Sequence, residues 1–241
     1  HPVVAVGVGC FGPLSLARSA PSFGCITTTP KPGWSGVDVR GILADQLGVP
    51  VAIQTDVTAA AIGEHRLGAG KGAESLVYLT IGTGVGGGFL LDGAPVGGRL
   101  HAEMGHFPTR RQPDDDFPGV CPFHGDCMEG MVSGPAIAAR WGMPGEQLPA
   151  GHAAWDLTAR LLADGLTTIL AVLAPNRVIL GGGVGGSPAL WSPLCDHLSA
   201  ALIGYWPSVS VRDWLVPPSL GEQSALVGGL ILAKEAMNDV R

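Results

Sequence analysis

The stretch VAIQTDVTAAAIGEHRLG, residues 51–68, sets a short β-branched segment directly before an alanine-rich one. VAIQTD predicts a buried strand over 51–56, and the residues after it predict a helix that ends at Gly68, because glycine commonly follows the last helical residue. The same alternation predicts further strands at 3–9, 76–82, 177–183 and about 208–216, and helices that start at Ser133 and cover 152–174, 187–205 and 221–237. Strands that alternate with helices indicate an α/β fold with mixed sheets.

Two connecting segments stand out between these elements. Asp92-Gly93 lies between apolar arms and predicts a hairpin turn. Residues 101–130 are polar, proline-rich and irregular, and they carry the most chemically distinctive side chains of the chain.

The bulk composition limits the class of protein. The 241 residues suffice for one or two domains, and 46% apolar against 14% charged residues predict a globular chain. The net charge of −6 argues against a nucleic-acid binder, which needs clustered Lys and Arg. The apolar stretch 152–174 contains Asp156, Arg160 and Asp164, so it predicts a core helix and no membrane contact.

The cysteines and the first residues bear on the compartment. The five cysteines have no paired spacing, so a disulfide framework is not expected, and Cys10, Cys25 and Cys195 are predicted to be free thiols. The opening HPVVAVGVGC does not have the plan of a signal peptide. Both features favour a cytoplasmic protein.

His106, Cys121, His124 and Cys127 form the pattern H-x14-C-x2-H-x2-C. Thiolate and imidazole donors at close spacing suit tetrahedral zinc, and four protein ligands leave no open position for a reacting water. The pattern therefore predicts a structural zinc that staples the 101–130 segment. The alternative is two surface cysteines and two unrelated histidines.

Asp56 is a candidate general base. It stands at the carboxyl end of the 51–56 strand, where open α/β sheets bind ligands, and a carboxylate there could accept the proton of a hydroxyl group. The alternative is an ordinary helix N-cap, which fits TDV better when that tripeptide is taken alone.

The glycine runs are candidate phosphate-binding turns. GTGVGGG (82–88) lets backbone N–H groups approach an anion, although hairpins also use glycine. LGGG (180–183) is a common turn after a strand in α/β proteins. Glu103, taken alone, fits a solvated loop acid.

Eight motifs together resemble the ROK family of sugar kinases, and within it the zinc-containing bacterial fructokinases. They run in family order over nearly the whole chain: GCFGP (9–13), TTTPKPGW (27–34), TDVTAAA (55–61), TIGTGVGGG (80–88), HAEMGH (101–106), CPFHGDCMEG (121–130), SGPAIAARWG (133–142) and LGGG (180–183).

The resemblance implies an actin-like (ribonuclease H-like) fold of two α/β lobes, with sugar and nucleotide between them. The implied small lobe comprises residues 1–56, completed by 221–241, and the large lobe comprises 57–220 with the zinc-stapled loop 101–130. Family members open with a glycine-rich phosphate loop that this sequence does not contain. A small lobe shortened at its N-terminus, and low or absent phosphorylation by the chain as given, are therefore expected.

The resemblance also assigns roles. Asp56 matches the general base, Glu103 and His106 match sugar ligands, and Lys31 lies near the sugar. Thr83 and Gly84 match the loop that approaches the nucleotide phosphates. Pro135 matches the adenine and ribose pocket, together with Gly181, Gly182 and Gly183.

The implied activity is transfer of the γ-phosphate of Mg-ATP to a hexose, with fructose as the expected sugar, by a homodimer that carries structural zinc. Two other functions stay open. One is a sugar sensor without catalysis, although the DNA-binding helix-turn-helix of such relatives is not present. The other is a zinc-dependent hydrolase, which would need an open zinc position.

Overall fold

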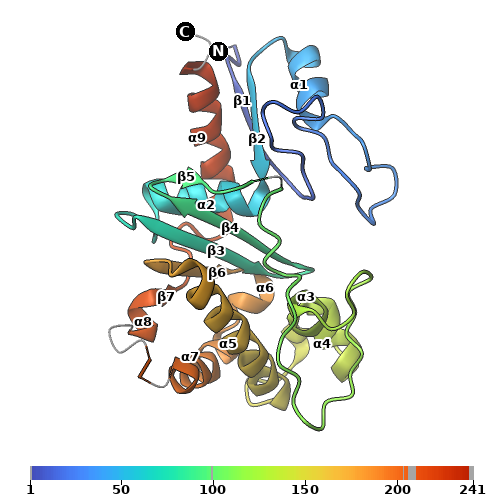
Figure 1. Ribbon diagram of the computed structural model, residues 1–241, viewed down its shortest axis with the longest axis vertical. Coiled ribbons are helices and arrows are strands. Elements are labelled where there is room, and N and C mark those ends of the chain that lie inside the picture. The colour runs from blue at the N-terminus through green and yellow to red at the C-terminus, as the bar shows by residue number, and fades with distance from the viewer. Residues whose placement is uncertain (1, 99, 203, 206–209, 239–241) are drawn as a thin grey trace. The chain divides into compact units, whose positions relative to one another are not determined.

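The structure is a computed structural model that describes all residues except 1, 99, 203, 206–209 and 239–241 (Figure 1). The chain divides into two compact units. The first unit comprises His1–Tyr78, Gly88–Ala102 and Pro218–Arg241, and the second comprises Leu79–Gly87 and Glu103–Pro217.

The first unit is built on two parallel strands. Its elements are β1 (Val6–Cys10), α1 (Val39–Leu47), β2 (Val51–Thr55), α2 (Asp56–Leu67), β5 (Ala94–Pro95), the 3-10 turn η2 (Gly221–Gln223) and α9 (Ser224–Asn238). β1 pairs with β2 in a register that sets Cys10 beside Thr55. The two strands therefore end side by side, and the residues that follow them are Phe11 after β1 and Asp56 after β2.

Helix α2 packs against α9 and β1, and small residues let the helices approach closely. A Cβ atom at Gly63 would overlap the carbonyl oxygen of Ser224, and one at Gly228 would overlap that of Ala59. This packing explains why the compact units do not divide at the expected boundary, Asp56: α2 belongs to the first unit. The correspondence between units and catalytic lobes stays a prediction.

A fully buried carboxylate fixes the start of α9. Glu64 of α2 accepts hydrogen bonds from the Leu220 N–H and the Ser224 hydroxyl, both at 2.8 Å, and from the Ala69 N–H at 2.7 Å. A buried charge is tolerated only when such donors replace water.

A five-stranded sheet has the order β5-β4-β3-β6-β7, and the division into units passes through β3 (Ser75–Ile81) and β4 (Val85–Leu91). β4 and β5 pair antiparallel, while β6 (Arg177–Gly181) and β7 (Leu215–Val216) pair parallel. The mixed α/β organisation predicted from the sequence is confirmed. So is the hairpin turn, where Asp92 and Gly93 both have positive φ (51° and 75°), as a primed turn requires.

The second unit holds most of the helices. They are α3 (Met128–Val132), α4 (Gly134–Trp141), the 3-10 turn η1 (Gly145–Gln147), α5 (Ala153–Leu173), α6 (Gly182–Gly185), α7 (Pro188–Leu202) and α8 (Val211–Trp214). α5 packs against α7 and α3. Among the described residues, no helix is both long and apolar enough to cross a membrane.

Three sequence predictions need correction. The strand expected at about 208–216 is wrong over 211–214: residues 206–209 lie outside the described residues, α8 covers 211–214, and β7 is confined to 215–216. Trp214 explains the difference, because its side chain is buried and its Nε1–H donates to the Pro175 carbonyl at 2.8 Å.

The strand expected at 177–183 ends at Gly181, because Gly182 adopts a positive φ of 86° and turns the backbone. Helix α1 was not predicted, because none of its residues is buried.

Candidate functional site

Asp56 is the first residue of α2, and Thr55 is the residue that caps the helix. The Thr55 hydroxyl oxygen accepts from the Thr58 N–H at 3.1 Å and donates to the Thr58 hydroxyl at 2.7 Å. The alternative reading of Asp56 as the N-cap is therefore wrong. Its Oδ1 atom accepts a hydrogen bond from the adjacent Val57 N–H at 2.8 Å.

The surroundings of Asp56 act on its charge in opposite directions. Although part of the residue reaches solvent, crowding by protein atoms desolvates the carboxyl and raises its pKa. The Val57 N–H and the positive charge of Lys31 oppose this rise. A carboxylate whose pKa is raised accepts a proton more readily than an ordinary aspartate does.

Lys31 lies in the same unit as Asp56. Its Nζ atom sits 3.5 Å from the centroid of the Phe11 ring, a cation–π contact. The Trp34 ring packs edge-on against Phe11 with 5.3 Å between centroids. The Lys31 charge also lowers the pKa of the Cys10 thiol, which desolvation and Asp56 raise.

His101 is a residue near Asp56 that the sequence reasoning missed. Its Nε2 atom accepts from the Leu14 N–H at 3.0 Å, so the ring proton resides on Nδ1, which faces the Ala102 carbonyl at 3.3 Å. The available signal was its place as the first residue of HAEMGH.

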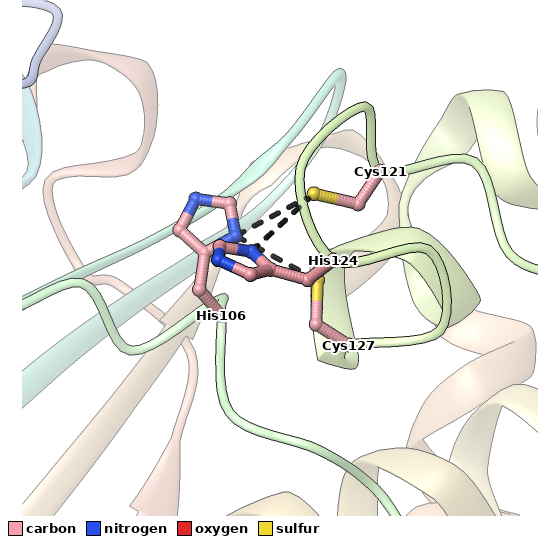
Figure 2. Close-up of side chains that lie close together, drawn as sticks. All are labelled: His106, Cys121, His124 and Cys127. Atoms are coloured by element: carbon pink, nitrogen blue, oxygen red, sulfur yellow. Dashed lines mark hydrogen bonds between the residues drawn. The ribbon is translucent and has the colours of Figure 1, made fainter. Parts of the chain in front are cut away.

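The four predicted metal ligands converge in the second unit (Figure 2). Cys121 Sγ lies 3.7 Å from Nδ1 of both His106 and His124, and Cys127 Sγ lies 3.6 Å from Nδ1 of His106. A tetrahedral zinc with bonds of about 2.3 Å to sulfur and about 2.0 Å to nitrogen separates such atoms by about 3.5 Å. The donor set and its spacing therefore fit zinc with all four positions filled.

A tight turn brings the ligands of CPFHGDC together. Cys121 and Gly125 exchange backbone hydrogen bonds of 3.2 and 3.0 Å, and Gly125 adopts a φ of 59°. Cys127 forms an antiparallel bridge to Pro108, which follows His106 by two residues. Burial raises the pKa of the Cys127 thiol to about 11, so a metal must displace a proton to bind it.

Glu103 lies on the other side of the His106 ring. His106 Nε2 is 3.9 Å from Glu103 Oε2, and the His106 N–H donates to the Glu103 carbonyl at 3.1 Å. Because Nδ1 faces the cysteine sulfurs, Nε2 and the Glu103 carboxylate are directed away from the cluster. The two predicted sugar ligands are thus neighbours, and a metal ion in the cluster would fix the ring of one of them.

Hydrogen bonds with residues of α3 and α4 fix the glycine-rich turn that follows β3. Gly134 donates its N–H to the Gly82 carbonyl at 2.7 Å, and the Glu129 carboxylate accepts from the Val85 N–H at 3.0 Å. A Cβ atom at Gly84 would come within 2.7 Å of that carboxylate. Sequence reasoning missed Glu129. The available signal was an acidic residue two positions after Cys127, a predicted metal ligand.

The other predicted nucleotide-pocket residues gather around the same turn. Ser133 caps α4 as predicted, since its hydroxyl accepts from the Ala136 N–H, and Pro135 stands in the first turn. Gly182 packs so tightly on Ile81 that a Cβ atom would overlap it, whereas Gly183 faces open space. Thr83, Pro135 and the Gly181–Gly183 run thus border the ends of the neighbouring strands β3 and β6.

Comparison with known proteins accounts for this arrangement. The sequence profile of the ROK family matches residues 1–236. The chain belongs to the ROK family. Its α/β fold is the actin-like fold of ROK sugar kinases, as the sequence analysis predicted.

Several ROK proteins are similar over almost the whole chain. The fructokinase of Zymomonas mobilis is 42% identical over 235 residues, which cover 96% of this chain and 78% of the relative. The putative fructokinase of Bacillus subtilis is 40% identical over 237 residues, which cover 97% and 79%. The ROK family glucokinase from Streptomyces griseus, solved with glucose and AMPPNP, is 26% identical, with a TM-score of 0.76 over 98% of this chain and 83% of that one.

Proposed function

We propose that this protein is a fructokinase that transfers the γ-phosphate of ATP to fructose and forms fructose 6-phosphate. The observation that carries the proposal is the identity of about 40% to proteins named fructokinase over 97% of the chain. The described residues support it, because they include a candidate base, candidate sugar ligands and a glycine-rich turn suited to phosphates.

Asp56 would act as the general base. A sugar hydroxyl is a weak nucleophile, and a carboxylate within hydrogen-bond reach can take its proton as the phosphoryl group arrives. The raised pKa of Asp56 makes its carboxylate a better proton acceptor than an ordinary aspartate, and the Lys31 charge opposes this rise.

Glu103, His106 and Lys31 would bind the sugar. Carboxylate, imidazole and ammonium groups suit hydroxyl recognition, because each makes strong, directed hydrogen bonds. Discrimination against glucose or mannose would then depend on a few of these contacts.

The glycine-rich turn with Thr83 and Gly84 would meet the phosphates through its backbone N–H groups. Pro135 and Gly181–Gly183 would line the side of the adenine and ribose. Magnesium bound with ATP would neutralise charge that develops on the transferred phosphoryl group.

Zinc would be structural. His106, Cys121, His124 and Cys127 fill its tetrahedral positions, so a zinc-bound water for hydrolysis has no place. The proposed task of the metal is to hold the 101–130 segment so that Glu103 and His106 keep their orientation.

The test is a phosphorylation assay with ATP and fructose, followed by competition among fructose, glucose and mannose. Fructose phosphorylation at a low rate, with preference over the other two hexoses, is expected. Fructose binding without phosphate transfer would favour a sugar sensor, and preference for a sugar that is not a hexose would overturn the assignment. Light scattering during the same purification tests the proposed homodimer.

A further inference from the structure

The surroundings of Asp56 contain a cation whose position is set by aromatic rings. In the β1–β2 register, Phe11 and Asp56 are the residues that directly follow the paired ends of the two neighbouring strands. Lys31 Nζ rests 3.5 Å from the Phe11 centroid, and Trp34 supports the ring from its edge. An ammonium group over a ring face keeps its full charge, which a salt bridge would offset.

We propose that Lys31, held by the Phe11 ring, is a positioning residue that keeps Asp56 in the carboxylate form required of the base. This inference rests on the proposed kinase function. It gives Lys31 a role besides sugar binding and gives Phe11 a role through Lys31.

The charges around Asp56 support this role. Cys10 faces it from β1, Lys31 from the loop before α1, and His101 from the segment after β5. The Lys31 charge lowers the pKa of both the Asp56 carboxyl and the Cys10 thiol, whereas desolvation raises both. His101 Nε2 accepts the Leu14 N–H at 3.0 Å, so this nitrogen is engaged with the backbone. Of Lys31 and His101, Lys31 is the group that an aromatic ring holds in position.

The sign of the effect follows directly. Removal of a positive charge near a carboxyl raises the pKa of that carboxyl, because the ionised form loses a favourable interaction. The base is then protonated over a wider acidic range. The acid limb of the pH–rate profile should move to higher pH.

The experiment compares pH profiles of kcat at saturating fructose for the parent protein, Lys31→Met and Phe11→Leu. Lys31→Met should move the acid limb to higher pH, with turnover recovered on the alkaline side. Phe11→Leu should give a smaller shift in the same direction, because the ammonium loses its fixed position. Lys31→Arg and Phe11→Tyr keep the charge and the ring, so they should restore the parent limb.

The chain offers matched controls in the same unit. Arg40 lies over the Phe23 ring at 5.1 Å, and Phe23 packs on the same apolar cluster as Phe11. Phe23→Leu removes a comparable ring, and Lys71→Met removes an exposed charge beyond the far end of α2. Neither should move the acid limb.

The outcomes separate the inference from the function on which it rests. A Lys31→Met protein with a raised KM for fructose and an unmoved acid limb would make Lys31 a sugar ligand only, and would overturn the inference. Absence of phosphorylation by the parent at every pH would overturn the proposed function. In that case a carboxyl carbon-13 NMR titration of Asp56, assigned with Asp56→Asn, still decides the inference: an unchanged midpoint in Lys31→Met would refute it.

Discussion

The Sγ atom of Cys127 lies 3.6 Å from Nδ1 of His106, a residue 21 positions earlier in the chain. The other ring nitrogen of His106, Nε2, lies 3.9 Å from the Glu103 carboxylate. One metal ion at this point would connect the turn of CPFHGDC to a predicted sugar ligand. We therefore expect metal content and sugar affinity to change together.

Cys127→Ser should release zinc from a protein that otherwise holds one per chain. The His106 ring then loses its orientation, and a hydrogen bond to a charged group is worth about 1.5–3 kcal/mol, so the Kd for fructose should rise about tenfold or more. Elemental analysis and titration calorimetry measure the two effects. Cys195→Ser, at a buried cysteine outside the cluster, is the control. Normal fructose affinity in the metal-free variant would contradict the stapling role.

Asp56→Asn should leave fructose affinity nearly unchanged and lower kcat by about 10²–10⁴-fold, the contribution of a positioned base. The amide keeps the size of the side chain but cannot take a proton. Equilibrium binding and steady-state kinetics separate the two quantities. Asp45→Asn, an exposed residue of α1, should change neither. A loss below tenfold for Asp56→Asn would remove the residue from the chemistry.

The parts of this site that were predictable depend on local spacing. Cys121, His124 and Cys127 fall within seven residues, so their convergence is visible in the sequence, and His106 follows from the family motif. Glu129 and His101 were missed because their contacts, with Val85 and Leu14, join residues 44 and 87 positions apart. No periodic pattern reports such contacts.

The same distinction holds for the fold. Strand β3 and helix α5 are buried and strongly apolar, and their bounds were predicted within about two residues. Helix α1 buries no residue, so its evidence lies only in its ends: Asp38 accepts the Gly41 N–H at 2.7 Å, and Gly48 is left-handed with φ 64°. Segment 211–214 was assigned to the wrong class because Trp214 is buried through a contact with Pro175, far away in the sequence.

Gly84→Ala should impair nucleotide use. A Cβ atom there would come within 2.7 Å of Glu129 Oε2, so the turn or the carboxylate must move. Misplacement of a catalytic loop by about 1 Å can cost about 10²-fold, so kcat/KM for ATP should fall by about 10–100-fold. Steady-state kinetics with varied ATP measure this. Gly151→Ala, where an added Cβ atom meets no neighbour within 4 Å, should behave as the parent. Unchanged ATP kinetics in Gly84→Ala would mean that this turn does not meet the phosphates.

Arg140→Met should destabilise the 101–130 segment without involving the metal. The Arg140 guanidinium contacts both oxygens of Asp115, at 2.5 and 3.1 Å, and the two side chains are only 12% and 6% exposed. Loss of one partner leaves a buried charge unpaired, which costs about 3–5 kcal/mol of unfolding free energy. Urea unfolding measures the loss. Arg66→Met, which breaks an exposed pair with Glu235, should cost less than about 1 kcal/mol.

The contribution of this pair should also depend on pH, with a fixed sign. Its hydrogen bonds to Arg140 hold the pKa of the Asp115 carboxyl below its usual range. A carboxyl whose pKa is lower in the folded than in the unfolded state stabilises the folded protein. This stabilisation is complete at pH values above the unfolded-state pKa of about 3.9, and it is lost as the pH falls through the folded-state pKa. The difference in unfolding free energy between the parent and Asp115→Asn should therefore be largest near neutral pH and shrink in acid. A difference that stays constant from pH 7 down to the acid transition would show that Asp115 contributes through packing and not through its charge.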